Sequence, residues 1–321
     1  MILSVLQAHE GLLVFLGAVA LSQLLPLNSW YHPNSFLSHL FKTIAKRVYK
    51  KSHPGHQLMI SGTLAFVLPV AVILALIFGI KAFALFPNWI DGLLLYLCLE
   101  TSTGLRKVDK IARFLELNQK ATAKQMTSQL VARDTASLSE MGIVKACVES
   151  ISLNHIRQFW LVILFYVIAG PWLMVIYKLL LLINHAWRTF ILPNSYFLKP
   201  LNKTLFILEY PLIRGLIALL SIFQNYKKTW HYIHHYGRHA YQSNSGWILS
   251  LFAASLNIQI GGPAHYLGEK LQKTRIGLER PPVPDDLKVA TALIRQLQWF
   301  GVLFIALIWV LFTFALSFKF K

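Results

Sequence analysis

Residues 58–80 read LMISGTLAFVLPVAVILALIFGI and contain no charged side chain. A helix of about 20 apolar residues is long enough to cross the ~30 Å hydrocarbon core of a bilayer. A helix that is apolar on every face over this length is typical of a membrane span or of the core of a large protein. The segment therefore predicts a transmembrane helix, and it decides the fold class of the chain.

The composition of the whole chain agrees with this prediction. Of its 321 residues, 55% are hydrophobic and only 14% are charged, which is too apolar for a soluble domain of this size. We expect an all-α, polytopic membrane protein in which residues 1–321 form a single integral membrane domain. Apolar runs predict about six transmembrane helices, near residues 10–26, 58–80, 85–100, 159–183, 203–223 and 297–318. The third run is short and contains Asp91, so a re-entrant or interfacial helix is the alternative there.

The basic residues predict how these helices are oriented. Lys and Arg number 31 against 13 Asp and Glu, and apolar runs of this length exclude a nucleic-acid-binding protein as the explanation. Cytoplasmic loops retain positive charge beside anionic membrane lipid. Residues 27–57, 101–157 and 224–296 hold five, nine and nine basic residues, whereas the alternate segments hold six together, namely 81–84, 184–203 and 319–321. We expect a multi-pass protein of the bacterial inner membrane with the three basic, helical loops in the cytoplasm.

A polar block begins at Arg133, ahead of a predicted helix in the second basic loop. Ser137 and Glu140 have the spacing of a capping box, in which two side chains satisfy the free amides of a helix start. Arg133 adds a guanidinium to those amides, which is an arrangement suited to phosphate. Capping alone and anion binding both explain the block. Glu149 and Asn154 follow, close to the membrane surface.

Two further polar positions lie in or beside apolar runs. Arg214 falls inside a predicted span with Glu209 nearby, which indicates an internal ion pair or a functional polar site. Lys178 lies nearer a span end, where snorkelling to the surface would explain it. Asn244 and the pair Gly261-Gly262 enclose an apolar stretch too short to span, with the glycines forming a tight turn.

A histidine group lies in the third basic loop. On one continuous helix His231, His235 and His239 would share a face, with the i, i+4, i+8 spacing that can chelate a transition metal. No Cys, Asp or Glu joins them. An aromatic, basic interfacial helix is the other interpretation, and we assign no metal ligand in the chain.

Taken in order, these pieces resemble the CobD/CbiB family of cobalamin biosynthesis. The resemblance covers most of the chain, and its most specific part is the block that begins at Arg133. The matching residues are His32-Pro33, Arg133-Asp134-Thr135, Ser137-Leu138-Ser139-Glu140, Glu149-Ser150, Asn244-x-Gly246-Trp247, Gly262-Pro263, Tyr266 and Gly268.

The resemblance implies an adenosylcobinamide-phosphate synthase. Such an enzyme is a ligase that joins adenosylcobyric acid, a corrinoid, to aminopropanol or its phosphate, and it forms the amide at the expense of ATP with Mg²⁺. By similarity, the catalytic residues would be Arg133, Asp134 and Glu149. The substrate-binding residues would be Thr135, Asn154, Arg214, Asn244, Gly261 and Gly262.

The chain departs from the family pattern at acidic positions. Where the family tends to show A-E-N-T-x-D-G after Glu-Ser, this chain keeps Asn154 but has His155 and Gln158 among the residues that follow. Leu205-Phe206 stands where the family has paired Asp. These losses remove carboxylates that would hold Mg²⁺ or act as general bases. The alternative is a non-catalytic, AmpE-like regulatory or signalling protein of the same fold, with a second copy or another membrane protein as its partner.

Overall fold

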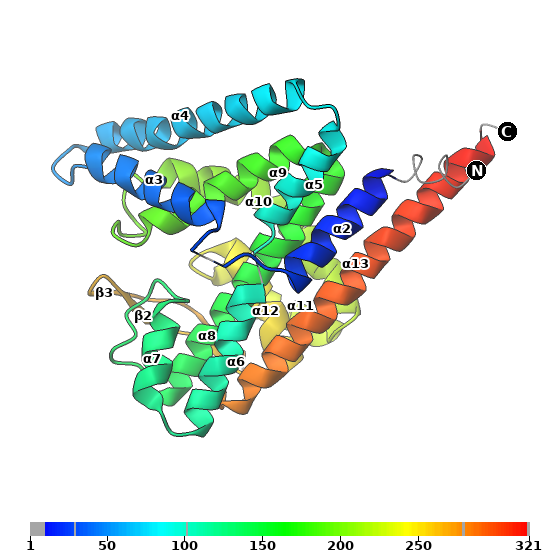
Figure 1. Ribbon diagram of the computed structural model, residues 1–321. Helices are drawn as coiled ribbons and strands as arrows, with labels where there is room; N and C mark the ends of the chain where they lie inside the picture. The colour runs from blue at the N-terminus through cyan, green and yellow to red at the C-terminus, as the bar shows by residue number, and fades with distance from the viewer. Residues whose placement is uncertain (1–9, 29, 101, 278–279, 320–321) are drawn as a thin grey trace.

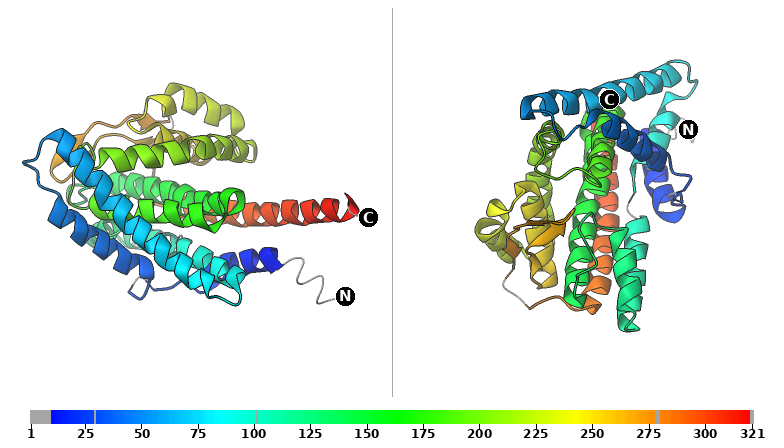
Figure 2. Two further views of the ribbon diagram at one scale, coloured as in Figure 1. Left: turned by 90° about the horizontal axis from the view of Figure 1, so that it is seen from above. Right: turned by 90° about the vertical axis from the view of Figure 1, so that its left-hand side faces the viewer.

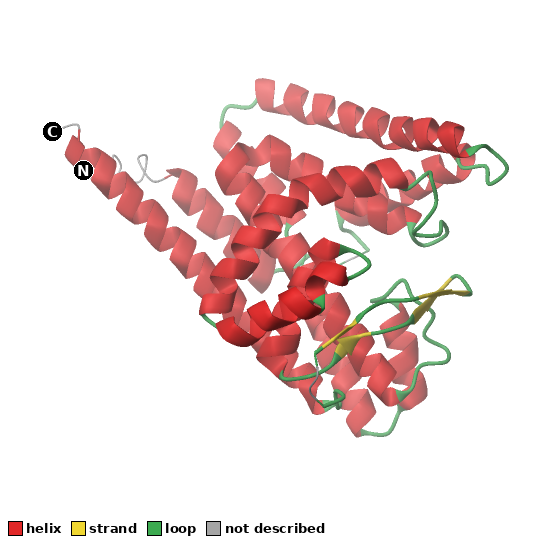
Figure 3. Ribbon diagram, turned by 180° about the vertical axis from the view of Figure 1, so that it is seen from behind, coloured by secondary structure: helices red, strands yellow, loops and turns green. Residues whose placement is uncertain are grey.

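The computed structural model describes residues 10–28, 30–100, 102–277 and 280–319 (Figure 1). These residues are mainly helical, with two small pairs of strands on one side of the molecule (Figure 3). The expected fold class, an all-α polytopic membrane protein, is confirmed. The helices are α2 (Glu10–Leu24), α3 (Pro33–Val48), α4 (Gly55–Ala82), α5 (Pro87–Cys98), α6 (Ser102–Glu116), α7 (Lys120–Ser128), α8 (Glu140–His155), η1 (Ile156–Trp160), α9 (Leu161–Trp187), α10 (Lys199–Ile222), α11 (Tyr226–His235), η2 (Gly237–His239), α12 (Ser243–Leu256) and α13 (Asp285–Lys319).

Four helical segments in the described chain are long and apolar enough to cross a bilayer, namely Gly55–Ala82, Glu140–Trp187, Lys199–Ile222 and Asp285–Leu311. The first of these, α4, lies along the outside of the molecule (Figure 1). Only 17% of its most apolar window is buried, and side chains such as Leu68, Leu76 and Phe78 are exposed. Exposed apolar faces of this extent are suited to lipid. The last helix, α13, reaches beyond the other helices (Figure 2).

The predicted spans at 10–26 and 85–100 correspond to shorter helices, α2 and α5. The 12 residues of α5 rise only about 18 Å, which is less than the ~30 Å core of a bilayer. The two helices pack so closely at Gly92 that a Cβ added there would lie 2.4 Å from Val14 Cγ1. Asp91 forms an ion pair with Lys81 at 2.6 Å. This geometry favours the re-entrant or interfacial alternative for residues 85–100.

The apolar run predicted as one span at 159–183 is a helical hairpin. Gly170 has φ 77° and ψ −176° and is followed by Pro171, a backbone conformation open only to glycine. The rings of Phe165 and Tyr177 lie 4.6 Å apart, although residues separated by this distance in sequence would be about 18 Å apart on a straight helix. The chain therefore turns back at Gly170, and residues 171–187 return toward α8.

This hairpin corrects the predicted side of residues 184–203. Charge counting places them across the membrane from residues 101–157 and 224–296, since it treats every apolar run as one crossing. In the structure the Tyr241 hydroxyl donates to Asn194 Oδ1, and all three segments line one cleft. They therefore lie on the same side.

The polar block before α8 also differs in register from the prediction. Ser139 is the N-cap, and its hydroxyl accepts from Gly142 N at 3.2 Å. The predicted capping box of Ser137 and Glu140 is wrong, because Glu140 is the first residue of the helix and not its third. The loop 101–157 holds three helices, α6, α7 and α8.

The strands form two antiparallel pairs after α12. In the first, β1 (Ile260–Gly261) pairs with β4 (Arg275–Ile276); in the second, β2 (Ala264–Tyr266) pairs with β3 (Glu269–Leu271). Gly261 and Gly262 both have positive φ, and a Cβ on Gly261 would lie 2.5 Å from the carbonyl oxygen of Thr274. The predicted tight turn at these glycines is wrong, because Gly261 lies in β1 and the turn of this segment lies at Leu267 and Gly268, between β2 and β3.

Candidate functional site

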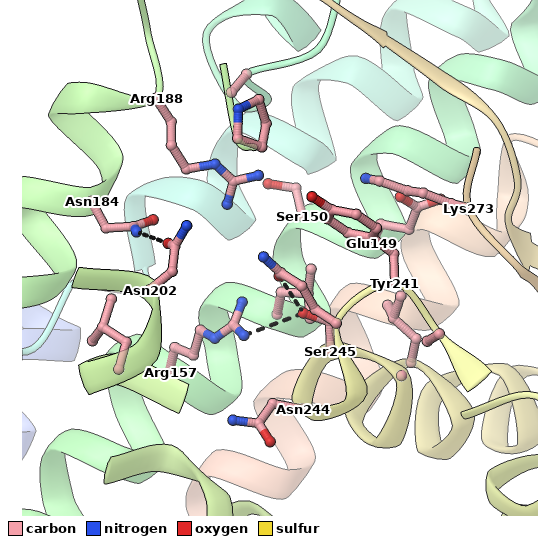
Figure 4. A pocket seen from close by; sticks show the side chains of 18 of the residues that line it. Glu149, Ser150, Arg157, Asn184, Arg188, Asn202, Tyr241, Asn244, Ser245 and Lys273 are labelled. Atoms are coloured by element: carbon pink, nitrogen blue, oxygen red, sulfur yellow. Dashed lines mark hydrogen bonds between the residues drawn. The ribbon is translucent and has the colours of Figure 1, made fainter. Parts of the chain in front are cut away.

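A cleft of about 840 Å³ lies in the part of the chain that the structure describes. Its lining comes from α8 and η1, from the end of α9, from the beginning of α10, and from the segments on either side of α12. The side chains of Arg157, Arg188, Ser245 and Tyr241 surround it (Figure 4). The Gly261 segment reaches the Arg133 side through a hydrogen bond in which Gly261 N donates to Glu149 Oε1 at 3.0 Å.

Arg133 and Glu149 form one side of the cleft. Arg133 Nη1 lies 3.6 Å from Glu149 Oε2, and Arg133 Nη2 donates to the carbonyl of Gly142 at 3.3 Å. Arg133 Nε is buried and has no hydrogen-bond partner among the described residues. The Glu149 carboxylate is thus bound by Arg133 and Gly261, while Arg133 Nε is a donor without a partner among the described residues.

Asp134 and Thr135 lie outside the cleft lining. The Asp134 carboxylate accepts from Gly268 N at 3.1 Å, and its backbone N donates to His265 O at 2.9 Å. Leu267 and Gly268 both have positive φ, as the tight turn between β2 and β3 requires. Asp134 therefore fastens this strand pair to the chain ahead of α8.

A network at the floor of the cleft holds Glu209. Arg157 donates to both of its carboxylate oxygens, at 3.0 Å from Nε and 3.2 Å from Nη2. The Tyr177 hydroxyl donates to it at 3.2 Å, and Asn244 Nδ2 donates at 3.4 Å. Glu209 is 3% exposed. We call Glu209, Arg157, Tyr177 and Asn244 the floor network.

Of the two interpretations of Arg214, the internal ion pair with Glu209 is wrong. Arg214 instead donates to Asn244 Oδ1 and to Ser243 Oγ, and its guanidinium stacks over Tyr210 at 3.9 Å. Arg214 does not line the cleft, whereas Asn244 does. Arg214 thus acts on the cleft by orienting Asn244. Of the other predicted substrate-binding residues, Asn154 and Gly261 line the cleft and Gly262 does not.

The wall opposite the Arg133 side carries cations that the sequence prediction missed. Arg188 follows the last residue of α9, and Lys199 and Lys203 lie in the first turns of α10. Asn184 Nδ2 donates to Asn202 Oδ1 at 2.7 Å and joins the two helices at this point (Figure 4). We call Arg188, Lys199 and Lys203 the cation wall. The available signal was Arg188, a basic residue just past the apolar run 159–183. Charge counting placed it on the opposite side of the membrane from the basic loops.

The charge of the cleft is strongly positive. Six basic side chains line it against two carboxylates, and both carboxylates are bound to arginines: the bases are Arg133, Arg157, Arg188, Lys199, Lys203 and Lys273, and the acids are Glu149 and Glu209. An excess of positive charge in a concave site attracts and holds anions. The cleft is suited to phosphate or carboxylate groups.

A smaller hollow of about 450 Å³ adjoins the cleft and shares Ser150, Asn154 and Gln158 with it. Glu100 lines this hollow and accepts from Lys178 at 3.4 Å. Lys178 is 2% exposed and also donates to Gln158 at 2.6 Å. The expectation that Lys178 snorkels to the surface is therefore wrong.

Metal ligands do not gather in the part of the chain that the structure describes. No group of three His, Cys, Asp or Glu side chains there could hold a metal ion. The continuous helix that would align His231 and His235 with His239 is absent from these residues, since α11 ends at His235 and His239 lies in η2. The cleft residues do not fit the carboxylate-held Mg²⁺ that the family resemblance implies, and we derive no step through that ion.

Comparison with known proteins identifies relatives of this chain. The family model described as CobD/Cbib protein matches residues 15–184. The cobalamin biosynthesis protein CobD of Chromobacterium violaceum is 21% identical over 295 residues, covering 88% of this chain and 91% of the relative.

Two further relatives agree. The cobalamin biosynthesis protein CobD of Clostridium perfringens is 27% identical, covering 78% of this chain and 82% of the relative. The cobalamin biosynthesis protein CbiB of Salmonella typhi is 25% identical, covering 77% and 81%. No solved structure matches the chain. The chain therefore belongs to the CobD/CbiB family of cobalamin-biosynthesis proteins.

Proposed function

We propose that this protein is an adenosylcobinamide-phosphate synthase, which joins adenosylcobyric acid to aminopropanol or its phosphate in an ATP-dependent amide-forming reaction. The proposal is supported by the family and by one observation, the uncompensated positive charge of the cleft. Adenosylcobyric acid carries a carboxylate, and ATP and aminopropanol phosphate carry phosphate groups; cations with directed donors are what such groups require.

Arg133 supports a role in this reaction more directly than the other predicted catalytic residues. Its Nε is a buried donor without a partner among the described residues, and such a donor costs free energy unless a ligand or water satisfies it. An oxygen of the substrate carboxylate or of a phosphate would do so. Glu149 holds the guanidinium in place through its ion pair, and Asp134 supports the strands that bring Gly261 to the cleft.

The test is growth on cobyric acid of a bacterial cell that lacks its own synthase. The chain is expected to restore growth, and Arg133→Ala is expected to abolish it. Arg106→Ala is the matched control, because Arg106 is an exposed arginine on α6, outside the cleft lining. Failure of a well-expressed, membrane-inserted protein to restore growth would contradict the proposal.

One observation favours the alternative, a non-catalytic AmpE-like membrane protein. Both carboxylates that line the cleft are bound to arginines, so among the described lining residues no carboxylate is free to act as a general base. On this alternative the cleft would bind an anionic ligand or partner segment without turning it over. Ligand binding by the purified protein without any amide product would support it.

A further inference from the structure

The cation wall lacks acidic partners, whereas Arg133 and Arg157 of the same cleft are each paired with a glutamate. The ammonium group of Lys203 and the guanidinium of Arg188 form no ion pair and no hydrogen bond with the residues that the structure describes. The ammonium group of Lys199 makes only a cation–π contact with Tyr196, at 5.5 Å. Arg188 is half-buried, and its guanidinium lies toward Ser150 across the hollow (Figure 4). A charge that has lost part of its hydration without gaining a partner is costly. Such a group is completed by a ligand of opposite charge.

The electrostatic surroundings of Arg188 point the same way. Burial is the main cause that lowers the pKa of Arg188; nearby Tyr266 and Tyr241 act in the opposite direction, while the positive charge of Arg157 acts with burial. A guanidinium stays protonated despite such a shift. Arg188 therefore remains a cation although burial and nearby Arg157 disfavour its charge. An anion bound beside it would stabilise that charge.

The beginning of α10 adds to this wall. The helix starts at Lys199 without a side-chain N-cap and without an acidic residue in its first turn. Its positive end is thus not neutralised by its own side chains. Since Lys199 and Lys203 lie on this helix and line the cleft, the helix dipole and the two ammonium groups act at the same end of the hollow.

We infer that the cation wall, Arg188 with Lys199 and Lys203, is a phosphate-binding subsite, distinct from the Arg133 side where the sequence pattern places phosphate. The fork of the guanidinium binds two phosphate oxygens, and the lysines neutralise the remaining charge. The inference deepens the proposed function, and it rests on that function for the soluble source of the phosphate. The subsite would hold the phosphate chain of the nucleotide, leaving Arg133 to the acid or the amine partner.

The experiment measures binding of inorganic pyrophosphate and of a non-hydrolysable ATP analogue to the full-length protein, purified in an uncharged detergent, by calorimetry. Arg188→Gln is expected to weaken binding by about tenfold to a hundredfold, because it removes charge-assisted hydrogen bonds. Arg106→Gln removes the same charge from an exposed site outside the cleft and is expected to leave binding unchanged. Equal binding by Arg188→Gln and the wild type would overturn the inference.

A second variant protects the test against misfolding. Arg188→Lys keeps the charge but not the fork, and it is expected to fold and to bind with intermediate affinity. If this folded variant and Arg188→Gln both bind like the wild type, the subsite is excluded. If neither binds and both unfold like the wild type on heating, the inference stands.

Phosphate could also come from a lipid headgroup, and two lipid compositions separate the sources. The measurement is repeated in nanodiscs of phosphatidylcholine and in nanodiscs that contain phosphatidylglycerol. A soluble phosphate ligand binds equally in both, whereas a lipid ligand makes phosphatidylglycerol compete with pyrophosphate in an Arg188-dependent way. Either result retains the subsite, and the second moves its ligand to the membrane.

Failure of the proposed function and failure of this inference give different results. Arg188-dependent pyrophosphate binding without restored growth on cobyric acid would remove the synthase and keep the subsite. Restored growth with full pyrophosphate binding by Arg188→Gln would keep the synthase and remove the subsite.

Discussion

The floor network and the cation wall face the same cleft in opposite electrostatic states. At the floor, Glu209 accepts from Arg157, Tyr177 and Asn244, so its charge is matched by nearby donors. On the wall, Arg188 has no acidic partner in the described chain. A matched network fixes side chains and contributes to folding, whereas unmatched cations contribute to ligand binding. The difference indicates which cleft residues hold the site together and which remain available to a ligand.

The largest predicted effect separates these roles at the floor. Glu209→Gln should lower the free energy of unfolding by about 3–5 kcal/mol, because it removes a buried carboxylate and leaves the half-buried Arg157 guanidinium without its counter-charge. Glu269→Gln, at an exposed glutamate of β3, should change it by less than about 0.5 kcal/mol. Denaturant unfolding of the purified protein measures both. Equal stability of the two variants would mean that the floor network does not support the fold.

The next effect tests the hairpin that brings Arg188 to the cleft. Space does not limit a side chain at Gly170 or Gly215, since a Cβ at either position would meet no heavy atom within 4 Å beyond the adjoining backbone. Gly170→Ala should still destabilise by about 1–3 kcal/mol because of its backbone conformation. Gly215→Ala, inside α10, should stabilise by about 0.5–1 kcal/mol. The same sign of change in thermal unfolding for both variants would contradict the hairpin.

A smaller effect distinguishes support from catalysis at Asp134. Asp134→Ala removes the acceptor for Gly268 N and should lower the free energy of unfolding by about 0.5–1.5 kcal/mol. If Asp134 only positions the strands, the variant retains part of the growth on cobyric acid at low temperature. Complete loss of growth in a variant as stable as the wild type would instead favour the catalytic role implied by the family resemblance.

The smallest predicted effect on stability belongs to the cation wall. Arg188→Gln should change the free energy of unfolding by no more than about 0.5 kcal/mol, because no partner among the described residues loses a contact. The same variant should lose pyrophosphate affinity, whereas Glu209→Gln loses stability. A large destabilisation by Arg188→Gln would show that the wall is part of the scaffold and would remove the contrast with the floor.

The sequence predicts the fold class well because apolar runs report burial in lipid directly. It does not predict the hairpin at Gly170, since hydropathy is the same for one long span and for two arms that fold together. The dipeptide Gly170-Pro171 inside the run was the signal for a break. Charge counting then assigned Arg188 to the wrong side, because it treated the hairpin as a single crossing of the membrane.

The candidate site was predicted in part for a related reason. Family resemblance points to Arg133, Glu149 and Gly261, and these residues do meet. Ion-pair partners depend on tertiary structure: Glu209 lies only five residues from Arg214 in sequence, yet it pairs with Arg157, 52 residues away. Local spacing cannot choose between partners when the chain folds back on itself.

The most direct measurement is a chemical cross-link between the segment that carries the cation wall and the segment that follows α11. Asn194 and Tyr241 are in contact, while the native Cys98 and Cys147 are buried. In membranes, Asn194→Cys with Tyr241→Cys should be joined by a short bifunctional maleimide, and Asn194→Cys with Lys227→Cys should not. The cross-link is the predicted result, whereas a bilayer between the segments would hold them about 30 Å apart. No cross-link, with each cysteine labelled by an impermeant reagent from a different face, would contradict the shared cleft.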